Sequence, residues 1–264
     1  MLGNSTRHTA RSARHIIERT ATTLALPLPK SLTKALAHAD DVTSQADQMV
    51  QHSALPTAVL DALAAGQDPP TDPAVQRALI GSALAGLQFP DRAADYAATL
   101  IVDALNTHAD TLLTTWAEAL EDDTNAMVHA ADVLPTHDLE DTKTIIRSAP
   151  DIIAAWSAAV EASKRWQAAT EGFGALATTA HTDATGHLVR ILPVLDADLD
   201  TARQLDTTDR RPTVWDIVCA GHEPALTTIT EFRARRSRLL DELRDAEAHA
   251  EAERAARYRR ALQI

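Results

Sequence analysis

The last forty residues of the chain, 225–264, contain neither glycine nor proline, so nothing in their sequence interrupts a helix. Pro224 stands directly before them, and proline suits the first helical position because its missing N–H would be unpaired there. At 1.5 Å per residue, a helix of about 40 residues is roughly 60 Å long. This exceeds the diameter of a compact domain of this chain length, so we expect part of the helix to project or to pack along a partner.

Apolar residues recur along this predicted helix at alternating spacings of four and three, which keeps one stripe facing a neighbouring helix. The stripe comprises Ala225, Ile229, Phe232, Arg236, Leu239, Leu243, Ala246 and Ala250. Arg236 interrupts it, as single polar residues do where the register of a coiled coil must be fixed. Beyond Ala250 the same spacing falls on Glu253 and Arg257, so the stripe stops. Two interpretations follow: a self-association or docking helix, or a first half packed on its own body with a solvated tail.

The end of the same helix is rich in arginine and free of acids. Cations near a helix C-terminus are favoured by the helix dipole alone, which accounts for some of them. The rest are expected to dock on an acidic protein surface or on nucleic acid. The predicted partner-binding residues are therefore Ile229, Phe232, Arg236, Leu239, Leu243, Arg254, Arg257, Arg259 and Arg260.

The remainder of the chain also has helical periodicity, and sustained two-residue alternation is absent, which predicts an all-α fold. We expect a bundle of roughly nine or ten helices: a body over 1–222 with a possible sub-boundary at the linker 66–73, followed by the helix 223–264. The segment between Pro90 and Pro135 should form one long helix or two with a break near 121–125.

Several local features of the body are predicted from glycine and proline. Asp72 and Pro73 are typical of a helix start, and Gly221 of a left-handed helix cap. We expect a shorter helix over 136–149 and a helix over 187–207 with a kink or restart at Pro193. Glycines 172, 174 and 186 predict a looser zone before it.

The net charge of −12 is unevenly distributed. Residues 1–34 carry six Lys/Arg and one acid (+5), and residues 231–264 carry nine Arg and seven acids (+2). The body, 35–230, keeps 25 − 15 = 10 bases and 37 − 8 = 29 acids, a net charge of −19. Such a body repels phosphate, so nucleic-acid binding is expected only at the basic ends. Those ends are also expected to pair with acidic surfaces, either of their own body or of a neighbour.

The single Cys219 excludes an internal disulfide and fits a reducing compartment. No run of 18 apolar residues is present, and the N-terminus lacks the apolar block of a secretory signal. We therefore expect a protein without a membrane span, located in the cytoplasm or packaged into a particle from it.

One set of residues resembles a metal site. His137 and Asp138 are adjacent, His108 lies upstream, and several Asp follow. The pattern is similar to the His…His-Asp…Asp set of the HD phosphohydrolases, which are all-helical, and the resemblance implies a divalent metal that activates water. The alternative is structural, because an acid in the first turn of a helix is favoured by the dipole and His108 fits an apolar stripe.

No signature of a serine hydrolase, a phosphate-binding loop or a di-iron bundle is present. Our leading hypothesis is a non-enzymatic structural, adaptor or assembly protein without a cofactor, acting through self-association or a protein partner at its C-terminal helix. In composition, an acidic helical body with a basic terminal helix resembles the general build of viral scaffolding proteins, which suggests a component of a virus-like particle. The alternatives are an HD-like metal-dependent phosphohydrolase and nucleic-acid binding through the basic ends.

Overall fold

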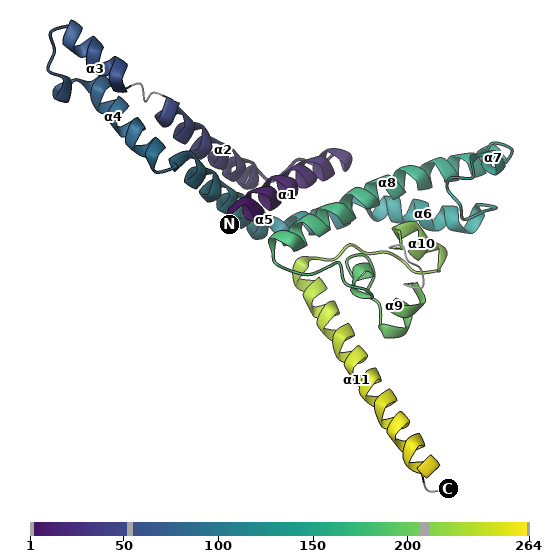
Figure 1. Cartoon of the computed structure of the whole chain (residues 1–264). Helices are drawn as coiled ribbons and strands as arrows, with labels where there is room; N and C mark the ends of the chain where they lie inside the picture. Colours follow the sequence, from purple (N-terminus) through teal and green to yellow (C-terminus); the bar gives the residue numbers. More distant parts are fainter. Residues whose placement is uncertain (1–2, 52–54, 206–211, 263–264) are drawn as a thin grey trace. The chain divides into compact units, whose positions relative to one another are not determined.

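A computed structural model describes residues 3–51, 55–205 and 212–262 of the chain (Figure 1). The described residues form α-helices and short 3-10 helices and no strand, so the all-α prediction is confirmed. The longer helices of the first half are α1 Gly3–Thr23, α2 Lys30–Gln51, α3 Leu55–Ala64, α4 Pro73–Gly86 and α5 Phe89–Ala119. The later helices are α6 Glu121–Val133, α7 Thr142–Ile145, α8 Pro150–Thr179, α9 Leu199–Leu205, α10 Val214–Cys219 and α11 Ile229–Leu262.

The chain divides into two compact units at three points, of which two fall inside helices, in α1 and in α5, and the third lies between α1 and α2. The first unit comprises Met1–His15 and Leu28–Thr107, and the second comprises Ile16–Pro27 and His108–Ile264. The linker 66–73 therefore lies inside the first unit, and α11 belongs wholly to the second.

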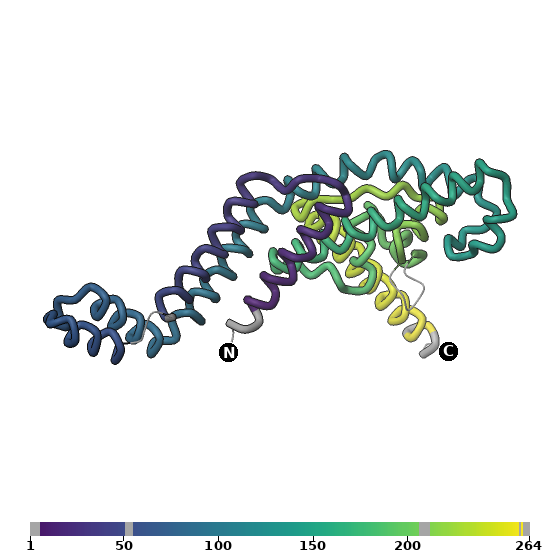
Figure 2. The backbone as a smooth tube through the Cα atoms, turned by 90° about the horizontal axis from the view of Figure 1, so that it is seen from above, coloured from purple at the N-terminus to yellow at the C-terminus, as the bar shows by residue number. Residues whose placement is uncertain are grey.

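In the first unit, α3 and α4 form a hairpin, and α2 lies beside α4 (Figures 1 and 2). The hairpin turn contains the 3-10 helix η1, Pro69–Thr71. Asp72 begins α4 as predicted: its carboxylate accepts the N–H groups of Ala74 at 2.7 Å and Val75 at 3.1 Å, and Pro73 occupies the first helical position. The unit is cored by small and aliphatic side chains: Ala10, Ala13, Leu32, Leu36, Ala39, Ala97, Ala98, Ile101 and Leu105.

In the second unit, α6 packs along α8 (Figure 1). Its largest fully buried side chains are Trp116, Trp166, Phe173, Phe232, Leu113, Leu120, Met127, Ile145 and Leu176. The break predicted near 121–125 lies one residue earlier, at Leu120, where α5 ends and α6 begins. A Thr213–Asp216 capping box starts α10, and Gly221 follows it with a φ of +83°, the predicted left-handed cap.

The predicted looser zone at glycines 172 and 174 is wrong, because α8 continues through both to Thr179. Gly172 is needed for packing: a Cβ at this position would lie 2.5 Å from Cζ3 of Trp116. The same helix holds the end of α1, since the hydroxyl of Thr20 donates to the carbonyl of Ala168 at 2.9 Å. The glycine therefore marks a close approach between helices and not a flexible joint.

The predicted helix over 187–207 is also wrong for most of its length. In the described part of this range, 187–205, only the 3-10 helix η2, Val189–Ile191, and α9 are helical, and the segment between them is irregular yet buried at Leu192, Val194 and Leu195. Residues 206 and 207 lie outside the described residues. Its carbonyls at Pro193 and Val194 accept the N–H groups of Thr227 and Ala225 at 3.0 and 2.8 Å. The apolar residues whose spacing suggested a helix therefore lie in a loop, and this loop is hydrogen-bonded to the segment that precedes α11.

That pairing also corrects the start of the last helix. Residues 223–228 are extended, so Pro224 and Ala225 precede the helix, which begins at Ile229. The helix within 136–149 shrinks to the single turn of α7, and the turn before it is held by the indole N–H of Trp156, which donates to the carbonyl of Leu139 at 2.9 Å. No described helix combines the length and the hydropathy that crossing a membrane requires.

Candidate functional site

The predicted partner-binding helix, α11, divides into two parts with different surroundings (Figure 1). We call residues 229–246 the base of α11 and residues 247–262 its tail. The base is buried along one face against the second unit, whereas the described side chains of the tail are all exposed. The two parts are taken in turn.

The base is fixed in the core by the first half of the predicted stripe. Ile229, Phe232 and Leu239 are buried, and Leu243 is half-buried. The ring of Phe232 meets that of Phe173 in α8 edge to face, with centroids 5.2 Å apart and an interplanar angle of 66°. These apolar residues are therefore occupied by their own unit and are not a free docking face.

The start of the base has its own capping network. Thr228 Oγ1 accepts the N–H of Glu231 at 3.1 Å, while the Glu231 carboxylate accepts the N–H of Thr228 at 3.0 Å. The pattern Thr-x-x-Glu is a capping box, so it was a signal in the sequence that places the helix start after Pro224. Asp110 of α5 adds to it by accepting the N–H of Ile229 at 2.8 Å.

Arginines of the base bind the loop 180–196. Arg233 donates to the carbonyl of Ala180 at 3.0 Å, and Arg235 donates to that of Leu192 at 3.0 Å. Arg238 forms an ion pair with Asp196. Arg236, predicted to fix a register against another helix, is half-buried within its own unit. The positive charge of the base is therefore used to hold this loop in place.

The tail makes hydrogen bonds and ion pairs only within itself, among its described side chains. Arg254 donates to the carbonyl of Ala250 at 3.2 Å, and Glu253 pairs with Arg257 at 3.5 Å and with His249 at 3.6 Å. Arg260 is exposed, and Tyr258 is 73% exposed. The side chain of Arg259 lies outside those that the structure describes. The tail is thus the part of the predicted site that remains free for a partner.

Half of the six cations in the basic segment 1–34 pair with carboxylates of their own chain. In the first unit, Arg7 pairs with Asp91 at 3.0 Å and Asp95 at 2.6 Å, and the hydrogen bond from Arg7 lowers the pKa of Asp95. Arg14 pairs with Asp40 at 2.7 Å. The basic ends were expected to pair with acidic surfaces of their own body or of a neighbour, and these pairs are of the first kind. Fewer cations are therefore left at this end to bind phosphate.

The residues that resemble an HD phosphohydrolase do not form a metal site. Among residues 3–51, 55–205 and 212–262, no three His, Cys, Asp or Glu side chains lie together as ligands of one ion. His108 is half-buried in α5, whereas His137 and Asp138 are exposed in the turn after α6. That turn is structural: the carbonyl of His137 accepts the indole N–H of Trp215 at 2.6 Å. The phosphohydrolase interpretation therefore has no geometric basis in the described residues.

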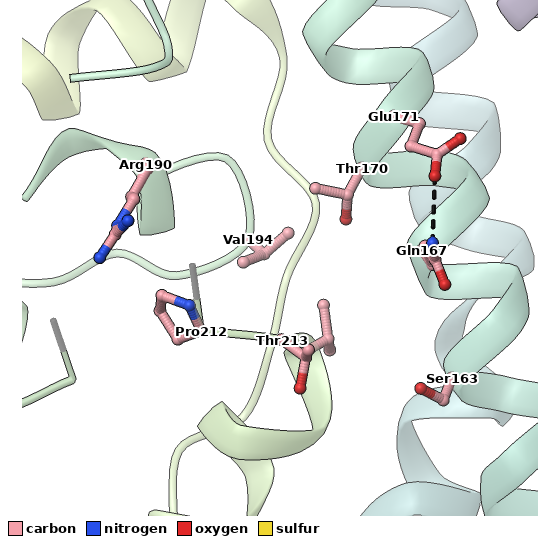
Figure 3. A pocket seen from close by; sticks show the side chains of 9 residues that line it. Ser163, Gln167, Thr170, Glu171, Arg190, Val194, Pro212 and Thr213 are labelled. Atoms are coloured by element: carbon pink, nitrogen blue, oxygen red, sulfur yellow. Dashed lines mark hydrogen bonds between the residues drawn. The ribbon is translucent and has the colours of Figure 1, made fainter. Parts of the chain in front are cut away.

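A cavity of about 310 Å³ lies between α8 and the loops around it (Figure 3). Ser163, Gln167, Thr170 and Glu171 project from successive turns of α8 towards Val194 and Thr213 on the far wall. Gln167 donates to Glu171 at 3.1 Å, and Glu171 also pairs with Arg19. The described lining contains neither His nor Cys, and its carboxylate, Glu171, is held by these two partners.

An exposed apolar surface on the α3–α4 hairpin was missed by the sequence reasoning. It comprises Leu60, Leu63, Leu79, Ile80 and Leu87, each between 56% and 65% exposed. The residues of each helix that face the other are mainly alanines, so the larger apolar side chains point outward. The signal was present in the sequence: leucines lie on more than one side of both helices, in a stretch with only four charged residues, Asp61, Asp68, Asp72 and Arg77.

Comparison with protein-family models, with curated proteins and with solved structures gave no match to this chain.

Proposed function

We propose that this chain is a non-enzymatic helical structural, adaptor or assembly protein. It acts by associating with a protein partner through the tail of α11. One observation carries the proposal: from Glu247 to Arg260 every described side chain is exposed and none makes a hydrogen bond or ion pair with the rest of its unit, although the base of the same helix is buried along one face.

The construction of α11 suits such a role. A helix of 34 residues is about 50 Å long, of which the tail supplies about 24 Å. Phe232 and Leu239 fix the base in the core, so the direction in which the tail leaves its unit is set by packing. A preformed helix loses little conformational entropy when a partner binds along it, and this favours association.

The hairpin α3–α4 supports an associating role independently. Apolar side chains gathered on an exposed surface of a soluble protein mark contact sites more often than catalytic ones. Leu60 and Leu63 lie one helical turn apart on α3, and Ile80 and Leu87 lie two turns apart on α4. Burial of each such side chain by a partner stabilises a complex by roughly 1.5–3 kcal/mol.

The proposal is tested with a variant that ends at Ala246. Removal of α11 from an earlier residue would expose the core around Phe232, whereas the described side chains after Ala246 are exposed, so removal of this part should leave the fold intact. Circular dichroism and thermal unfolding check this control. Tagged full-length and shortened chains are then expressed in the same host, retained proteins are identified, and each is rebound in purified form.

We expect a protein, either a second copy or another chain, that binds the full-length protein and not the variant ending at Ala246. Equal binding to both chains contradicts a role for the tail. If neither chain associates with itself or with any retained protein, the proposed function is wrong. Leu60→Ser with Leu63→Ser serves as a matched variant, because it tests the hairpin surface while leaving the tail intact.

A further inference from the structure

The tail of α11 carries its charge in two blocks of equal length. Residues 247–253 (EAHAEAE) hold three glutamates and no Lys or Arg, and residues 254–260 (RAARYRR) hold four arginines and no acid. Each block is seven residues, which is about two helical turns. The sign of the charge changes between Glu253 and Arg254, in the middle of the exposed part of the helix.

Two copies of this charge distribution attract each other in only one relative orientation of the two tails. Two tails that lie antiparallel and cross at the Glu253–Arg254 boundary place the acidic block of each copy along the basic block of the other. Glu247 then falls level with Arg260 of the second tail. Parallel tails would instead set three glutamates beside three and four arginines beside four, which is repulsive. Antiparallel helix dipoles also attract each other.

A row of small side chains permits close approach in that arrangement. Ala248, Ala252 and Ala255 follow the four–three spacing of a helix seam, and all three are exposed. Glu251 lies directly beside this row, at a position from which a charged side chain reaches across to a second helix, and Arg254 lies one turn further along on the same side. The tail thus combines a row that permits close contact with charge blocks that choose the orientation.

We infer that the occupant of the tail is a second copy of this chain, bound antiparallel through residues 247–260; this inference rests on the proposed function. The contact is about 21 Å long, and it buries less than the roughly 800 Å² per partner of a standard interface. The dimer is therefore weak, dependent on concentration and sensitive to salt. Its ion pairs are screened as the Debye length falls from about 10 Å in 0.1 M salt to about 3 Å in 1 M salt.

Sedimentation equilibrium of the full-length protein at these two salt concentrations is the first test. We expect a monomer–dimer equilibrium that shifts at least about 10-fold towards monomer in the higher salt. Reversal of either block should weaken the dimer at least about 10-fold, since each reversed tail repels its own copy. The two reversed proteins are Glu247→Arg with Glu251→Arg and Glu253→Arg, and Arg254→Glu with Arg257→Glu and Arg260→Glu.

An equimolar mixture of the two reversed proteins should restore a dimer, because a tail that is acidic except for Arg259 then meets an all-basic one. The matched control reverses three exposed cations outside the tail: Arg92→Glu, Lys143→Glu and Arg147→Glu. It changes the net charge as much as the arginine reversal does, and it should leave the dimer unchanged. If a reversed protein loses helix by circular dichroism, the matching glutamine variant replaces it and must weaken the dimer in the same direction.

The orientation is tested with single cysteines in a Cys219→Ser background and a short thiol cross-linker. In the antiparallel pair, position 252 lies about 4.5 Å along the axis from its own counterpart, and position 248 lies about 16 Å from its counterpart. Ala252→Cys should cross-link to itself and Ala248→Cys should not, whereas parallel tails would cross-link at both positions.

A monomer at all concentrations, a dimer that tolerates either reversal, or equal cross-linking at both positions overturns the inference. These failures differ from failure of the proposed function. If the purified chain stays monomeric but another protein binds it and not the variant ending at Ala246, the association role stands and only the identity of the partner is wrong.

Discussion

Asp110 of α5 accepts the N–H of Ile229, the first residue of α11, at 2.8 Å, and it also accepts the hydroxyl of Thr230 at 2.5 Å. The two residues are 119 positions apart, so a side chain from one helix caps the start of another. The cap ties the base of α11 to the helix that carries Trp116. It therefore fixes the buried start of α11 to the core of the second unit.

The cap makes Asp110→Ala destabilising by about 1–2 kcal/mol, because the N–H of Ile229 loses its acceptor at a partly buried site. Urea denaturation of the full-length protein measures the change. Asp103→Ala is the matched control, since Asp103 lies two turns earlier on the same helix with an exposed side chain, and its loss should change stability by less than about 0.5 kcal/mol. Equal effects of the two substitutions would contradict the cap.

Substitution of two glycines of α8 by alanine should change the stability of the protein in opposite directions. Gly172→Ala should destabilise the protein by roughly 1–3 kcal/mol, because its Cβ would lie 2.5 Å from the ring of Trp116 and 3.0 Å from the hydroxyl of Thr20. Gly174→Ala has no neighbour within 4 Å and should stabilise the helix by roughly 0.5–1 kcal/mol. Thermal unfolding compares the two, and a gain in stability at 172 would refute the close approach.

The two parts of α11 should respond differently to truncation of an aromatic side chain. Phe232→Ala removes a fully buried ring in contact with Phe173 and should cost about 3–5 kcal/mol of stability. Tyr258→Ala, in the tail, should change the free energy of unfolding by less than about 0.5 kcal/mol. Chemical denaturation distinguishes the two, and a large loss at Tyr258 would mean that the tail packs on its own chain.

The capping box at the start of α11 should make the stability of the protein depend on pH. Hydrogen bonds from the N–H of Thr228 and the hydroxyl of Thr227 lower the pKa of Glu231 below its ordinary value of 4.5. A lowered pKa in the folded state means that the stabilisation is complete above about 4.5 and is lost as the pH falls through the lower folded value. Glu231→Gln should therefore be less stable than the natural protein at pH 7, with a difference that shrinks in acid.

Denaturation of the natural protein and the glutamine variant between about pH 7 and pH 3 measures this difference. Glu251→Gln is the control, because Glu251 is exposed in the tail and its substitution should leave the profile unchanged. A constant difference between natural protein and Glu231→Gln over the whole range would show that the carboxylate does not cap the helix.

Cys219 should react slowly with alkylating reagents. Burial first, and the nearby carboxylate of Asp216 second, raise the pKa of its thiol from 9.0 to about 11. Since the thiolate is the reactive form, alkylation near pH 8 should be about 100-fold slower than for an unperturbed thiol. The rate with iodoacetamide in the folded and the denatured protein checks this, and equal rates would contradict the burial of the thiol.

Helix positions were predictable where the determining residues are local. Asp72 and Pro73, Gly221, and the break close to Leu120 all act within a turn or two of their own position. The start of α11 was predictable too, from the Thr228–Glu231 capping box, but Pro224 was a competing signal of the same kind. When two helix-start signals lie about one turn apart, local sequence rules do not show which of them begins the helix.

The errors lie where distant segments meet. The spacing around Pro193 is helical, yet the backbone there pairs with residues 225–227, a contact that no local pattern contains. Gly172 was interpreted as flexible because the approach of Trp116, 56 residues away, is invisible along the chain. The metal-site alternative likewise required His108 and His137 to converge with Asp138, and no such cluster of ligands occurs among the described residues.

The sequence by itself determined the helical class, most helix boundaries and the separation of charge along the last helix, because these depend on neighbours three or four residues apart. Only the tertiary structure decided how many residues of the apolar stripe of α11 are buried in the core of their own unit. Burial of Phe232 and Leu239 against α8 and its loops depends on packing between segments distant in the chain, and that packing ends before Glu247. The tail is exposed because packing against its own unit ends before Glu247, and the apolar spacing itself stops soon after, at Ala250.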